Sequence, residues 1–84
     1  MERFTVREGK AVRVQPERLE EALIQLARFE DMAQGLEREQ EEIAQRLAQL
    51  REQGREKTVQ FRELLAQKLT NQNMKLLLER WKIQ

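Results

Sequence analysis

The apolar residues between positions 19 and 50 recur at alternating spacings of three and four. This heptad pattern predicts a helix whose apolar seam faces another helix in a coiled coil. Pro16 suits the first turn of such a helix, and the acidic residues just after it lie where the helix dipole favours negative charge. We therefore expect a long helix over residues 16–53. Its seam consists of Leu19, Ala22, Leu26, Phe29, Ala33, Leu36, Gln40, Ile43, Leu47 and Leu50.

Gly35 lies inside this segment and raises the alternative of a turn there, which would give a three-helix bundle. Ala33 and Leu36 keep one heptad register on both sides of the glycine, although a turn would not require it. Glycine in a helix costs about 1 kcal/mol relative to alanine, whereas burial of one large seam residue stabilises by roughly 1.5–3 kcal/mol. The sequence therefore predicts that the helix continues through Gly35.

The second helix is expected over residues 58–82. Gly54 follows the last seam residue and is placed to end the first helix in a left-handed conformation, and Thr58 is a suitable N-cap. The stretch TNQN, residues 70–73, contains poor helix formers, so a break there into two short helices is an alternative. This helix carries two apolar faces, and both need cover. One is the stripe Phe61, Leu65, Leu69, Leu76 and Ile83, and the other is the cluster Met74, Leu77, Leu78 and Trp81.

The first fifteen residues predict a β-hairpin arm. Two short runs that favour strands, residues 4–7 and 11–15, flank Gly9, which can supply the positive φ of a tight turn. Phe4, Val6, Val12 and Val14 alternate with polar residues, which suggests one apolar face. Because an isolated hairpin is only marginally stable, we expect that face to pack on something.

The composition supports one mainly all-α domain over residues 1–84, a long antiparallel helical hairpin or coiled coil with a short N-terminal β-hairpin. The chain has 84 residues, of which 37% are charged and 39% hydrophobic, with few glycines and prolines. It has no cysteine and no histidine, which excludes disulfides, zinc sites of the Cys/His type and histidine catalysis. The abundant carboxylates fit a solvated helix face. We expect no enzyme, no cofactor and no small-molecule substrate.

The amino-terminal residues lack an apolar leader, and no run approaches the roughly 18 apolar residues of a membrane span. We therefore expect no membrane partner and a cytoplasmic location.

Charge is unevenly distributed although the net charge is only +1. Residues 1–16 carry four basic and two acidic groups, residues 17–53 five and ten, and residues 54–84 seven and three. In an antiparallel hairpin turning near residue 56, Lys75 falls opposite Glu37 and Lys82 opposite Glu30, so these lysines are expected to pair with the first helix. The alternative is that the lysines at positions 68, 75 and 82 contact phosphates.

We expect the protein to act through protein contacts as a structural or adaptor module, as a homodimer or with another helical protein. Gln40 interrupts the seam, and it either fixes register or reaches the rim of the seam. Trp81 and Phe29 are expected in the core, with a role as anchors for a partner as the alternative. The expected interface consists of Leu26, Phe29, Ala33, Leu36, Gln40, Ile43, Leu47, Leu50, Met74, Leu77, Leu78 and Trp81.

The alternative function is a DNA-binding regulator. Residues 61–83 resemble a helix-turn-helix in outline, with a short helix, a polar turn and a second helix that bears lysine, arginine, asparagine and glutamine. The turn has no glycine, and Asn71 stands where such motifs usually have an apolar residue. Nucleic acid is therefore the less favoured partner.

Overall fold

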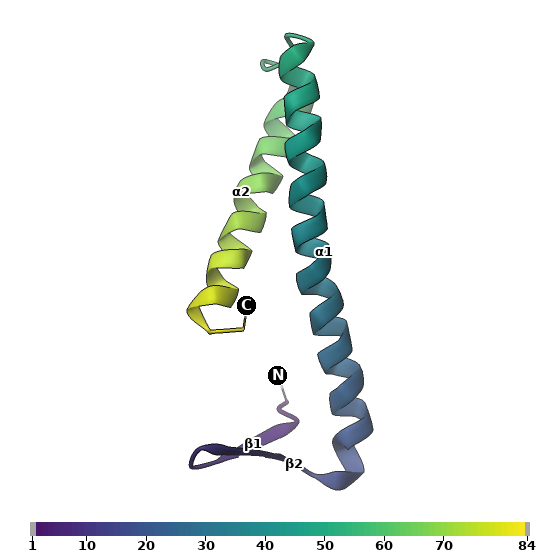
Figure 1. Ribbon diagram of the computed structural model, residues 1–84, viewed down its shortest axis with the longest axis vertical. Helices are drawn as coiled ribbons and strands as arrows, with labels where there is room; N and C mark the ends of the chain where they lie inside the picture. Colours follow the sequence, from purple (N-terminus) through teal and green to yellow (C-terminus); the bar gives the residue numbers. More distant parts are fainter. Residues whose placement is uncertain (1, 84) are drawn as a thin grey trace. The chain divides into compact units, whose positions relative to one another are not determined.

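The computed structural model describes residues 2–83, and it is mainly helical, as predicted. In chain order the elements are β1 (Thr5–Glu8), β2 (Ala11–Val14), the short 3₁₀ helix η1 (Pro16–Arg18), α1 (Leu19–Glu52) and α2 (Val59–Arg80) (Figure 1). The contacts divide the chain into two compact units, Met1–Ala33 and Gln34–Gln84. The expectation of a single domain stays a prediction.

The predicted β-hairpin is confirmed in the first unit. β1 and β2 pair antiparallel, and the two residues between them form the turn. Gly9 has a φ of +62°, while Lys10 is not among the residues with positive φ. This combination defines a type II′ turn, whose twist matches that of the flanking strands.

The expectation of one apolar hairpin face is wrong. In the observed register Val6 pairs with Arg13 and Val12 with Arg7, so Val6 lies on the face opposite to Val12 and Val14. Val6 is 51% exposed and Val12 56% exposed. Apolar and polar residues do alternate along each strand, as predicted. The length of the turn, however, decides which face of one strand lies beside which face of the other.

Helix α1 runs without interruption through Gly35, so the predicted continuous helix is confirmed and the three-helix bundle is wrong. The helix is preceded by the 3₁₀ turn of Pro16–Arg18, in which the Arg18 N–H donates to the Gln15 carbonyl at 2.9 Å. The Gly35 position has open space beside it, since a Cβ added there would meet no atom within 4 Å apart from its chain neighbours and the backbone of its own helix.

The loop between α1 and α2 forms as predicted, with Gly54 ending the first helix and Thr58 capping the second. Gly54 adopts a φ of +68°, its N–H donates to the Arg51 carbonyl at 3.0 Å, and the Arg55 N–H donates to the Leu50 carbonyl at 2.8 Å. These two bonds are a Schellman motif, which satisfies the last carbonyls of α1. At the start of α2 the Thr58 Oγ1 accepts from the Phe61 N–H at 3.3 Å, as an N-cap does.

Helix α2 is unbroken across residues 70–73, so the alternative of two short helices is wrong. Two polar side chains of this stretch bond within the helix: the Thr70 hydroxyl donates to the Ala66 carbonyl at 3.1 Å, and the Asn71 Oδ1 accepts from the Gln67 Nε2 at 2.9 Å. The helix ends with a second Schellman arrangement, in which Lys82 has a φ of 60° and the Ile83 N–H donates to the Leu78 carbonyl at 2.9 Å.

In the second unit, residues 34–52 of α1 and all of α2 form a helical hairpin (Figure 1). Its apolar core lies next to the loop and consists of Ile43, Leu47, Leu50 and Phe61, with Leu64 packed against them. The buried positions of α1 follow the predicted heptad register.

The inward face of α2 differs from both predicted faces. Its buried and partly buried residues recur at spacings of three and four, but half of them are polar. This face lies between the two apolar faces that the sequence suggested. Its members are Phe61, Leu64, Lys68, Asn71, Lys75 and Leu78.

Candidate interaction surfaces

A polar layer crosses the helical hairpin at Gln40. The Gln40 Nε2 donates to the carbonyl of Lys68 on α2 at 3.2 Å, and the residue is partly buried. Its Oε1 is buried and has no hydrogen-bond partner within residues 2–83. Gln40 thus spans the two helices and does not only reach the rim. That it fixes the register stays a prediction.

Asn71 is a second polar residue on the inward face of α2, and the apolar pattern of the sequence did not indicate that it is buried. It is the one buried polar residue among those the structure describes, with 1% of its surface exposed. Its Oδ1 accepts from the Gln67 Nε2 at 2.9 Å, but its Nδ2 has no partner in the described part of the chain. The spacing of position 71 from Leu64 and Leu78, seven residues on either side, could have revealed it.

The predicted pairing of Lys75 with Glu37 is confirmed. The Lys75 Nζ lies 3.0 Å from the Glu37 Oε1, and both side chains are partly open to solvent. Such a pair stabilises by only about 0–1 kcal/mol, so its effect is on register more than on stability. Lys68 and Lys75 lie on the partly buried face of α2, which leaves them poorly presented to phosphates. The pairing of Lys82 with Glu30 stays a prediction.

The apolar residues of the predicted interface on α1 fall into two groups, apart from Gln40, which is described above. Five are buried within the chain, with exposed fractions from 1% to 8%, and therefore offer no open surface: Ala33, Leu36, Ile43, Leu47 and Leu50. Leu26 and Phe29 belong to the first unit, where Leu26 is 53% exposed and Phe29 partly buried. The part of the seam that is open to a partner is thus its beginning.

The carboxy-terminal cluster is mostly exposed. Leu78 is partly buried, but Met74 is 47%, Leu77 51% and Trp81 69% exposed. The core position expected for Trp81 is wrong. The inward face of α2 follows alternating spacings of three and four, so position 82 continues it after Leu78, and Trp81, the C-cap of the helix, lies beside that face.

A stripe along one flank of α2 is also exposed. We call Leu65, Leu69 and Leu76 the outer stripe; they are 37%, 54% and 61% exposed. The sequence indicates that these leucines need cover, and α1 of the same chain leaves them exposed. Beside the stripe lies a groove of about 430 Å³, lined by Gln40, Gln72, Asn73, Lys75, Leu76 and Glu79. The second unit thus has an apolar surface with a polar groove next to it.

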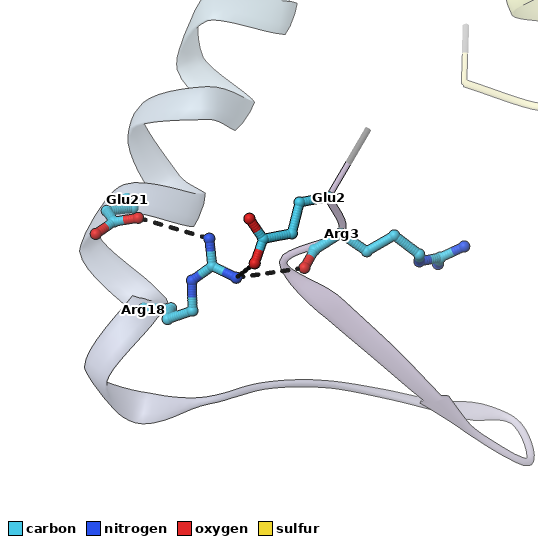
Figure 2. A network of polar contacts seen from close by, with 4 residues as sticks. All are labelled: Glu2, Arg3, Arg18 and Glu21. Atoms are coloured by element: carbon cyan, nitrogen blue, oxygen red, sulfur yellow. Dashed lines mark hydrogen bonds and ion pairs between the residues drawn. The ribbon is translucent and has the colours of Figure 1, made fainter.

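In the first unit Arg18 joins the amino-terminal residues to the start of α1 (Figure 2). Its guanidinium lies 3.3 Å from the Glu2 carboxylate and 3.7 Å from that of Glu21, and it donates to the Arg3 carbonyl at 3.5 Å. It also stacks over the Phe4 ring, 4.3 Å from the centroid. These contacts hold the residues before β1 in place.

The outline of a helix-turn-helix is not formed, because α2 is one helix from Val59 to Arg80. Within residues 2–83 no three carboxylate side chains gather as a metal site would need, and neither helix has an apolar stretch that could span a bilayer. No family model matches the chain, and no curated protein or solved structure is significantly similar to it. The geometry alone therefore supports a functional proposal.

Proposed function

We propose that this protein is a small structural or adaptor module that acts through helix–helix contacts and associates with itself as a dimer. The observation that carries the proposal is the exposure of the outer stripe on α2. Half of the inward face of the same helix is polar, with Lys68, Asn71 and Lys75, while the three leucines of the outer stripe are exposed. A helix whose only partner is α1 would be expected to place its leucines inward and these polar residues in solvent.

The energetics favour covering this surface. A leucine transferred from water to a packed interface stabilises by roughly 1.5–3 kcal/mol, and contiguous exposed apolar patches often mark protein interfaces. The outer stripe has three such leucines. Another amphipathic helix is the partner that fits them, because it matches their spacing along α2.

A second copy of the chain is the simplest source of that helix. The alternative of a different helical protein predicts that the chain remains monomeric, or poorly folded, until that protein is added. Nucleic-acid binding has less support, because the predicted recognition helix does not exist as a separate element. It would show as salt-dependent binding to duplex DNA that weakens in Lys75→Ala and Lys82→Ala.

The test is the mass of the native chain in solution, measured by light scattering across a range of concentrations. We expect a dimer that dissociates on dilution. Trp81→Ala, measured alongside, shows whether the exposed carboxy-terminal cluster takes part. A well-folded monomer at every concentration would overturn the proposal.

A further inference from the structure

The residues along the flank of α2 that bears the outer stripe form a second heptad series that the hairpin does not use. Arg62, Leu65, Leu69, Gln72, Leu76 and Glu79 follow one another at spacings of three, four, three, four and three. All six are exposed and all lie within Val59–Arg80. This is the spacing of a seam that packs against another helix.

The series can pair with the same series of a second copy that runs in the opposite direction. If two copies of α2 lie antiparallel with the two-fold axis between residues 70 and 71, Leu65 of each copy meets Leu76 of the other. Leu69 then meets Gln72, and Arg62 meets Glu79. Each contact occurs twice, as a two-fold interface requires. A parallel pair would instead place Arg62 beside Arg62 and Glu79 beside Glu79.

We propose that two copies of this chain associate through α2 in this antiparallel register. The inference rests on the proposed function and specifies its surface. Charge complementarity selects the second copy as the partner, because the apolar centre has an arginine at one end and a glutamate at the other. Neither Arg62 nor Glu79 forms an ion pair with any residue the structure describes, so both are open to such contacts.

The groove beside the stripe is consistent with this arrangement. Gln72, Leu76 and Glu79 line one side of it, together with Gln40 and Lys75 of the hairpin. Long side chains of the second copy can enter this groove where the two helices approach. The Gln72 amide, opposite Leu69, remains at the edge of the groove and keeps access to water.

Charge reversal tests the ends of the seam. Arg62→Glu and Glu79→Arg each turn two attractive contacts into two repulsive ones, so each should weaken dimerisation roughly tenfold. The double variant restores opposite charges and should dimerise about as well as the native chain. Both changes suit the helix dipole, because they bring acid toward the beginning of α2 and base toward its end.

Glu63→Arg is the matched control, because Glu63 is exposed on α2 and lies away from the seam. It makes the same charge change as Glu79→Arg and should leave the dimerisation constant unchanged. Circular dichroism of each variant verifies that its helix content equals that of the native chain.

Distances between spin labels test the direction of the helices. The chain has no native cysteine, so Glu63→Cys and Thr70→Cys can each be labelled at one position. In the antiparallel register the two labels at position 70 lie at nearly the same level along the helix axes. Those at position 63 are displaced along the axis by about 22 Å at 1.5 Å per residue. Parallel helices would give equal distances at the two positions.

The outcomes separate the two proposals. A native chain that stays monomeric overturns the proposed function and this inference with it. A native dimer in which the label distances are equal, or in which the double charge reversal does not restore what each single reversal loses, overturns the antiparallel α2 register alone. Restoration together with a much longer distance at position 63 than at position 70 supports it.

Discussion

Replacement of the buried Asn71 by leucine should stabilise the helical hairpin. The Asn71 side chain is almost fully removed from water and its Nδ2 has no partner in the described chain. A buried polar group without a hydrogen bond costs about 1–3 kcal/mol. A leucine there removes that cost and adds apolar contact with the adjacent core.

Two effects oppose the gain. The bond from Gln67 to the Asn71 Oδ1 is lost, but Gln67 is exposed and its amide can bond to water, so this costs no more than about 1 kcal/mol. Leucine is also larger than asparagine, and crowding in a core costs typically 1–3 kcal/mol. Because a two-helix interface is open at its edges, we expect the smaller value. Burial of the leucine side chain contributes roughly a further 1.5–3 kcal/mol, which leaves a net gain of about 1–3 kcal/mol.

The assay is urea unfolding followed by circular dichroism at one low protein concentration, with thermal unfolding as a second measurement. For a chain of this size the gain corresponds to a rise in Tm of about 5–15 °C. Asn73→Leu is the matched control, because Asn73 is exposed on the same helix and undergoes the same change in helix propensity. The difference between the two variants reports the effect of burial.

Asn71→Ala separates crowding from polarity, since it removes the amide without adding volume. If Asn71→Leu and Asn71→Ala both unfold at lower urea concentrations than the native chain, while Asn73→Leu does not, the amide is satisfied in solution. The reasoning from the unpaired Nδ2 would then be refuted.

Three further substitutions test the backbone and the first unit. Gly35→Ala should raise the free energy of unfolding by about 1 kcal/mol in urea titrations, because the helix there has room for a methyl group; a loss would indicate an unseen contact. Gly54→Ala should lower it by roughly 1–2 kcal/mol, because the residue has a φ of +68°, and an unchanged midpoint would contradict the Schellman assignment. Arg18→Ala should speed amide exchange in residues 2–8 while leaving the exchange of α2 unchanged, and equal protection in the native chain and the variant would count against the role given to Arg18.

The helices and their ends could be predicted because each depends on local rules. The heptad register on both sides of Gly35 indicated one helix, and Gly54 and Thr58 have backbone roles that few other residues fill as well. The pairing of Lys75 with Glu37 followed from the same register and the position of the loop. These features need no knowledge of how the rest of the chain packs.

The inward face of α2 could not be predicted from its apolar residues. A count of leucines favours the outer stripe, whereas the observed face includes Lys68, Asn71 and Lys75. Lysine can place its aliphatic stem against a core and its amine at the rim. A search for apolar residues alone therefore misses some of the residues that can face inward. Trp81 is exposed for the same reason, because it belongs to an apolar cluster that is not centred on the inward face. The β-hairpin faces depended on strand pairing, which alternation along one strand does not define.

Burial along α1 is graded with distance from the loop. Among the leucine and isoleucine residues of the seam in the second unit, the exposed fraction rises from 1% at Leu50 through 2% at Leu47 and 5% at Ile43 to 8% at Leu36. Contacts near the loop also close the shortest stretch of chain and so lose the least entropy on forming. The contacts near the loop should therefore form first when the hairpin folds, and those farther from the loop should form later. In the native state, the end of the hairpin farthest from the loop should open locally many times for each complete unfolding of the chain.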